Sequence, residues 1–133
     1  MPPAAFGQLV FAAPDIKKDL LEQKIDAMRR ITTGVSLYAS SHDGALLLSR
    51  ALQGGDENNY QRAGETHPTP MVAPPMQTID VSQATKGHSY VANSRAMLRD
   101  LSALLLEDRP LDTTSSNYIP VDVDAGYWML EAE

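Results

Sequence analysis

Three short apolar runs, each followed by a stretch of helical periodicity, most constrain how this chain of 133 residues can fold. The runs predict strands at residues 7–14, 34–40 and 76–82. Helices are predicted after each run, at residues 15–30, 43–52 and 89–108. Strands that alternate with helices are typical of a parallel sheet with right-handed crossovers. We therefore predict an α/β fold of about three parallel strands with flanking helices, in a single domain over residues 1–133.

The first predicted helix has the clearest local signals. Asp15 stands where an N-cap belongs, and the basic pair Arg29-Arg30 is favourable beside a helix C-terminus. An approximately helical apolar stripe is predicted to face the sheet. Its members are Ile16, Leu20, Ile25 and Met28.

Two stretches lack regular periodicity. Residues 54–75 are predicted to form a long loop, in which residues 55–65 (GDENNYQRAGE) are expected to be a solvated lid or disordered. Residues 111–133 are predicted to be a C-terminal tail that is polar until GYWMLE. The apolar residues of this end are expected to dock on the body of the protein, with Trp128 an anchor rather than a platform for substrate. They are Tyr127, Trp128, Met129 and Leu130.

A sheet of three parallel strands is thin, because parallel strands are normally flanked by neighbours and covered on both faces. We expect one edge, that of the first strand, to lack a partner. The chain therefore reads as a piece of a larger fold, and the exposed edge could pair with a second copy or with another partner.

Composition excludes several classes of function. The net charge is −6 and no Lys/Arg cluster exceeds the pairs Lys17-Lys18 and Arg29-Arg30, which argues against nucleic-acid binding. No cysteine is present, so disulfides and thiolate chemistry are excluded. The longest apolar stretch, LVFAAP, is too short to span a membrane, and MPPAAFGQ lacks the pattern of a signal peptide. The cellular compartment stays open.

Candidate functional residues follow the predicted strands, where active groups collect in open α/β sheets. Asp15 follows the first strand, His42 and Asp43 follow the second, and His88 follows the third. An acid followed by a histidine is the order of the last two triad members in α/β-hydrolases. His42, His67 and His88 have no ligand-like spacing, so we predict no metal and no cofactor.

Ser89 offers a competing interpretation, because GHSYV resembles the start of a Gly-x-Ser-x-Gly nucleophile elbow. The fifth position is Val91 instead of glycine, QATK separates the motif from the strand, and no histidine follows His88. We therefore favour His88 over Ser89 as the functional residue.

The same segments resemble a known family. LVFAAPDIKKDLLEQKI, GVSLYASSHDGALLLSRALQGG, TIDVS, GHSYVANSRAMLRDLSALL and GYWML look, in collinear order, like the C-terminal part of the bacterial α/β-hydrolases catalogued as domain of unknown function 900. The resemblance implies that Asp43 is the triad acid and His88 the triad base. Family members more often have Asn or another residue where this chain has His42. It also implies that the nucleophilic serine precedes the strand ending in AAPDI, so that this chain lacks it.

Alternatives from the residues alone remain. Asp43 could be only a helix N-cap, His88 a surface histidine, and Asp15 a cap rather than an acid. The leading hypothesis is a fragment of an esterase-like hydrolase for a small ester or acyl substrate, inactive until completed by an N-terminal half. Another is an interaction module that uses the exposed sheet edge. A third, a small complete ligand-binding domain, has no glycine-rich phosphate loop to support it.

Overall fold

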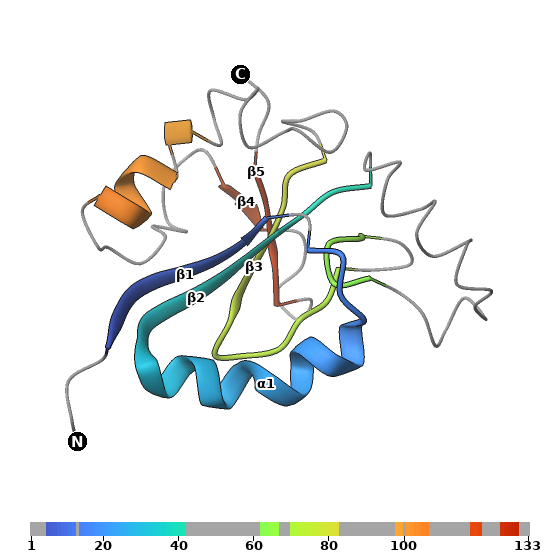
Figure 1. The fold of residues 1–133 in the computed structure, drawn as a ribbon. Coiled ribbons are helices and arrows are strands. Elements are labelled where there is room, and N and C mark those ends of the chain that lie inside the picture. Colours follow the sequence, from blue (N-terminus) through green and yellow to red (C-terminus); the bar gives the residue numbers. More distant parts are fainter. Residues whose placement is uncertain are drawn as a thin grey trace.

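The computed structural model describes residues 5–12, 14–41, 62–66, 70–82, 98–99, 101–106, 118–120 and 126–130. Within them a five-stranded sheet has the order β1-β2-β3-β5-β4 (Figure 1). Strands β1, β2, β3 and β5 run parallel, and β4 pairs antiparallel with β5. The elements are β1 (Phe6–Ala12), α1 (Lys18–Ile31), β2 (Thr32–Ala39), β3 (Gln77–Asp80), the π-helical turn η1 (Ser102–Leu106), β4 (Tyr118–Pro120) and β5 (Trp128–Leu130).

The predicted α/β fold with parallel strands is confirmed, and the sheet is wider than predicted. Docking of the C-terminal residues is also confirmed, because Trp128 pairs with Ile79 of β3 and Leu130 is buried. Residues Trp128–Leu130 join the sheet as a fourth parallel strand. The sequence did not predict this strand, because three apolar residues are too few to show a strand pattern. The predicted helix at 43–52 lies outside the described residues, as does most of the one at 89–108.

The sheet has a hydrophobic core on each face, as a parallel sheet requires. Alternate residues of one strand enter opposite cores: Val35 and Leu37 face α1, and Tyr38 faces the side of η1. The first core contains Leu21, Ile25, Val35, Leu37, Ala63, Met71, Ala73 and Met76. The second contains Tyr38, Ile79, Val81, Leu104 and Leu130. The chain therefore folds in three layers, with α1 beside the sheet in Figure 1 and the segment around η1 on its other face.

Helix α1 corrects two details of the sequence prediction. Leu21 is fully buried whereas Leu20 is 46% exposed, because Leu21, Ile25 and Met28 lie at i, i+4 and i+7 and so share one face. The predicted cap at Asp15 is also wrong. The helix begins at Lys18, with Lys17 at the N-cap position and no side-chain cap hydrogen bond.

The predicted loop 54–75 contributes to the core where the structure describes it. Arg62, Ala63 and Glu65 are buried, so the expectation of a solvated segment at 55–65 is wrong for its C-terminal part. Further along, the Thr78 hydroxyl donates to the Met71 carbonyl at 2.7 Å, which joins the end of this segment to β3. Sparse periodicity did not prevent burial, since isolated apolar residues in an irregular segment can fill gaps left by a helix.

Candidate functional site

The carboxyl ends of β2 and β3 lie side by side and at the same level. Ala39, the last residue of β2, is in register with Asp80, the last residue of β3. One residue further, the Val81 amide donates to the Ala39 carbonyl at 2.8 Å. The loops that leave these two strands therefore start next to each other.

A serine joins the two loop starts beyond the end of the sheet. The Ser41 amide donates to the Ser82 hydroxyl oxygen at 2.8 Å, and the Ser82 hydroxyl donates to Asp80 Oδ1 at 2.5 Å. The Ser82 amide donates to the same carboxylate oxygen at 2.9 Å, which is the geometry of an Asx turn. We call this set of three hydrogen bonds the serine junction. Hydrogen bonds to a carboxylate are stronger than those between neutral groups.

A second contact holds the loop after β2 from its other side. The Ser40 amide donates to the Gly64 carbonyl at 3.0 Å. The same segment reaches the residues after β1, because the Ala63 amide donates to the Ile16 carbonyl at 2.8 Å and the Gly64 amide to the Pro14 carbonyl at 3.1 Å. Residues 62–64 are thus wedged between the exits of β1 and β2, and sequence reasoning did not anticipate them there.

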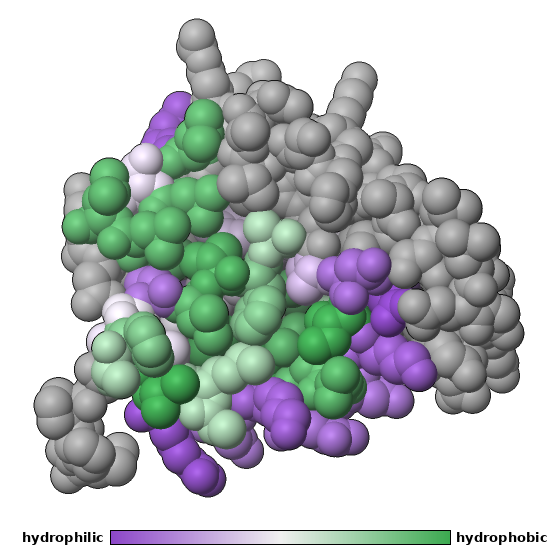
Figure 2. Space-filling model, in the orientation of Figure 1, coloured by the Kyte–Doolittle hydropathy of each residue, from purple (hydrophilic) through white to green (hydrophobic). Residues whose placement is uncertain are grey.

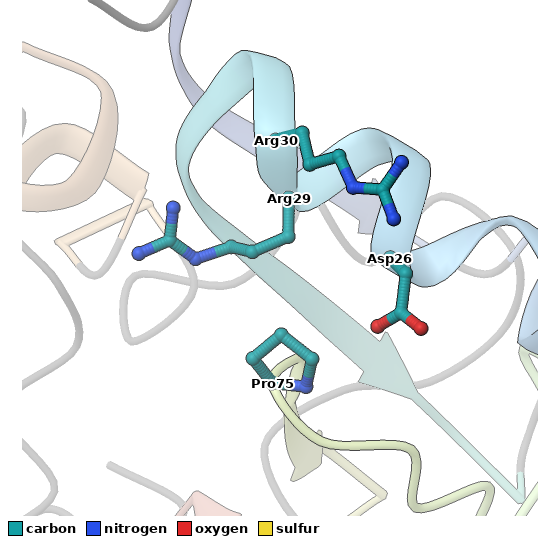
Figure 3. Close-up of a pocket in the computed structure, with 4 residues that line it drawn as sticks. All are labelled: Asp26, Arg29, Arg30 and Pro75. Atoms are coloured by element: carbon teal, nitrogen blue, oxygen red, sulfur yellow. The ribbon is translucent and has the colours of Figure 1, made fainter. Parts of the chain in front are cut away.

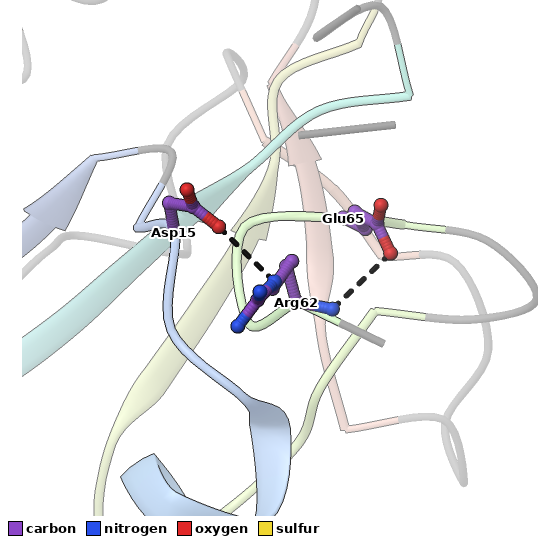
Figure 4. A network of polar contacts seen from close by, with 3 residues as sticks. All are labelled: Asp15, Arg62 and Glu65. Atoms are coloured by element: carbon purple, nitrogen blue, oxygen red, sulfur yellow. Dashed lines mark hydrogen bonds and ion pairs between the residues drawn. The ribbon is translucent and has the colours of Figure 1, made fainter. Parts of the chain in front are cut away.

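Arg62 supplies the charge in this wedge (Figure 4). Its guanidinium is almost fully buried, and Nε lies 3.1 Å from Oδ1 of Asp15, whose side chain is half exposed. The contact is an ion pair. The Arg62 amide also donates to Oε2 of the buried Glu65 at 3.2 Å. One carboxylate, that of Asp15, therefore pairs with the buried guanidinium, and the other, that of Glu65, accepts from the backbone of the same residue.

Asp43 and His88, the two predicted catalytic residues, lie outside the described residues, as do Ser89, His42 and His67. The structure places the residues that lead to them. Ser41 precedes Asp43 by two residues, and Ser82 precedes His88 by six. Trp128, by contrast, is described, and it packs against the core on the η1 face, which agrees with its predicted role as an anchor.

A hollow of about 460 Å³ opens at the amino ends of the strands, beside the last turns of α1 and the residues before β3 (Figure 3). It is lined by Asp26, Arg29, Arg30 and Pro75. The two guanidinium groups point to different sides in Figure 3, so they do not converge on one ligand. This hollow lies at the amino ends of the strands and is separate from the serine junction.

Over the part of the chain that the structure describes, no group of three or more His, Cys, Asp or Glu side chains could hold a metal ion. No helix in these same ranges combines the length and apolar character that crossing a membrane requires.

Comparison with known proteins gives a family match. A family model described as an alpha/beta hydrolase of unknown function (DUF900) matches residues 2–109, which is most of the chain. No curated protein and no solved structure matches this chain. The matched range includes β1, α1, β2, β3 and η1, and ends before β4 and β5.

Proposed function

The chain belongs to the alpha/beta hydrolases of unknown function (DUF900), and on that basis we propose that it carries the acid and the histidine of a serine-hydrolase triad. Asp43 is the acid and His88 the base. The reaction is hydrolysis of an ester or a related acyl substrate, and the serine comes from polypeptide outside these 133 residues. The observation that supports this best is the serine junction, because it brings together Ser41 and Ser82, which precede Asp43 and His88 in the chain.

The lengths of the two loop segments agree with the proposal. An extended chain spans at most about 3.5 Å per residue, so the two residues from Ser41 to Asp43 cover about 7 Å and the six from Ser82 to His88 about 20 Å. The two loop starts are joined by a direct hydrogen bond between Ser41 and Ser82. These upper limits permit contact between the two side chains.

The chemistry assigns each residue one task. The Asp43 carboxylate accepts a hydrogen bond from Nδ1–H of His88, which holds the ring in the tautomer whose Nε2 is free to act as a base. His88 then takes a proton from the serine hydroxyl and returns it to the leaving group. No Gly-x-Ser-x-Gly sequence occurs in these 133 residues, so on this proposal the isolated chain holds two of the three triad members.

Nitrogen NMR of the histidine rings tests the pairing of Asp43 with His88 directly. The intact chain is expected to show His88 protonated on Nδ1 when neutral, and Asp43→Asn is expected to abolish that preference, because an amide can also present a donor to the ring. Asp19→Asn is the matched control, since Asp19 lies in the exposed first turn of α1. A tautomer that is the same in all three proteins would contradict the proposal.

Labelling with a fluorophosphonate tests where the nucleophile is. We expect the 133-residue chain to remain unlabelled, because Ser89 lacks the elbow sequence and a later histidine. Labelling that disappears in Ser89→Ala but persists in Ser102→Ala would show instead that Ser89 is the nucleophile.

A second candidate function rests on the edge of the sheet. Strand β1 is the terminal strand of the described sheet, and its sequence FGQLVFA has no charge and no proline, the devices that usually protect an edge. Figure 2 shows apolar side chains gathered where β1 and the segment 98–106 lie. Exposed among them are Phe6 (63%) and Leu106 (84%). As this second candidate we propose that two copies of the chain pair through β1.

Sedimentation equilibrium distinguishes this candidate from a monomer. Self-association is expected to weaken in Phe6→Lys, because a charged side chain would replace an exposed apolar one at the edge that pairing buries. The control is Leu20→Lys, an exposed leucine on α1 away from the edge, which is expected to leave association unchanged. A monomer at every concentration would rule out pairing.

A further inference from the structure

Ser82 occupies a position that the triad chemistry does not explain. It lies two residues beyond the last residue of β3, and its hydroxyl is used twice, once as an acceptor from the Ser41 amide and once as a donor to Asp80. The Asp80 carboxylate also accepts from the Ser82 amide, so the side chain and the backbone of one residue are held by one anchor. A hydroxyl with a fixed donor and a fixed acceptor has one orientation.

The serine junction adds something that the sheet does not already provide. Strands β2 and β3 are joined by their ladder and by the bond from Val81 to Ala39, so the sheet itself is closed without Ser82. The bond from Ser41 to Ser82 acts one step further out, on the segments that lead away from the sheet. Its partners are 41 residues apart in the chain, so neither loop could make it alone.

The bonds of the junction also reinforce one another. When the Ser82 hydroxyl donates to the Asp80 carboxylate, the negative charge on Ser82 Oγ increases. Ser82 Oγ is the atom that accepts from the Ser41 amide, so the first bond strengthens the second. The Ser40 amide is bound separately to Gly64. Two consecutive amides before His42 and Asp43 are therefore anchored, one to the loop after β3 and the other to the wedge at residues 62–64.

We propose that Ser82 is a positioning residue that couples the loop carrying Asp43 to the loop carrying His88. The inference rests on the proposed function of those two residues and adds a residue to which neither the sequence motifs nor the family match assigns a role. Ser82 does not touch the substrate. Its bond to Ser41 holds the residues before Asp43 close to the residues before His88. The position of the Asp43 carboxylate relative to the His88 ring depends on that contact.

Ser82→Ala and Ser82→Thr in the full chain provide the test, with two NMR measurements. Hydrogen exchange at the Ser41 amide is expected to become about five- to tenfold faster in Ser82→Ala, the range that loss of one hydrogen bond produces. The Nδ1–H tautomer of His88 is expected to lose population in the same variant. Ser82→Thr keeps the hydroxyl and is expected to restore both. Ser102→Ala, which removes a hydroxyl that donates to the Leu98 carbonyl, is the matched control and is expected to change neither.

The outcomes separate this inference from the function on which it rests. If Asp43→Asn changes the His88 tautomer and Ser82→Ala does not, Ser82 has no positioning role and the acid–histidine pair stands. If neither variant changes the tautomer, the pair itself is wrong and Ser82 has nothing to position. A change in both, reversed by Ser82→Thr, supports the coupling, because a loss of general stability would not be selective for this hydroxyl.

Discussion

The two ends of the parallel strands are held together in different ways. At the amino end, α1 passes into β2 without an intervening loop, and the turn is closed by neighbours in sequence: Thr32 Oγ1 donates to the Met28 carbonyl at 2.9 Å, and Arg29 Nη1 donates to the Thr32 carbonyl at 2.7 Å. At the carboxyl end, the partners come from distant parts of the chain, as in the bond from Ser41 to Ser82.

This difference has a physical consequence. Local bonds form at little cost in chain entropy, because the residues between the partners are already ordered by the helix. Long-range bonds form only after the sheet has brought their partners together. The carboxyl end is therefore the part of this fold whose geometry depends on the whole tertiary structure, and it is the part where we place the function.

The largest effect is expected from removing Arg62, the buried cation beside the carboxyl ends of the strands. Arg62→Met is expected to lower the free energy of unfolding by about 2 kcal/mol, because the ion pair of the buried guanidinium with Asp15 is lost while the buried Glu65 carboxylate keeps its bond from the residue 62 amide. Urea denaturation measures the change. Arg29→Met, at the amino end, is the control and is expected to cost less than about 1 kcal/mol, since that side chain is exposed. Equal losses would mean that the two ends are held by similar forces.

A smaller effect is expected from the serine junction. Ser82→Ala should lower the free energy of unfolding by about 1 kcal/mol, the usual net contribution of a hydrogen bond of this kind. In hydrogen-exchange measurements the faster amides should belong to two separate stretches, near residue 41 and near residue 82. Acceleration confined to the loop after β3 would show that the two loops are not coupled.

The smallest effect is expected at the amino end. Thr32→Val keeps the shape of the side chain and removes the hydroxyl that donates to Met28, at an expected cost of about 0.5 kcal/mol. Exchange should quicken only in the last turn of α1 and the start of β2. A spread of the effect to residues 40–41 would contradict the view that this end is held locally.

Local patterns were enough to predict several elements. Strands β1, β2 and β3 and helix α1 lie within a few residues of their predicted ranges, because their apolar periodicity reports burial on a face regardless of what covers it. The position of β1 at the sheet edge was also predicted from its lack of a partner. Two errors at α1, the cap at Asp15 and the burial of Leu20, concern the rotation and first turn of the helix, which packing decides.

For the proposed site, the sequence predicted two residues that the structure does not describe. The order of Asp43 and His88 after consecutive strands, together with the family resemblance, identified both residues, and they stay predictions because they lie outside the described part of the chain. No sequence pattern assigned a role to Ser82 or to Arg62, although Ser82 ends the TIDVS segment. A serine in a turn and an arginine in an irregular loop are common on surfaces, and only their tertiary partners distinguish these two.

By itself, then, the sequence determined the kind of fold and the parallel direction of its first three strands, since these follow from periodicity and from the alternation of strands with helices. Tertiary structure alone decided that Trp128–Leu130 join the sheet beside β3, that residues 62–64 enter between two strand exits, and that Ser41 and Ser82 meet. Those contacts join residues far apart in the chain, so they stabilise the protein only once the sheet has formed. No short stretch of sequence therefore predicts them.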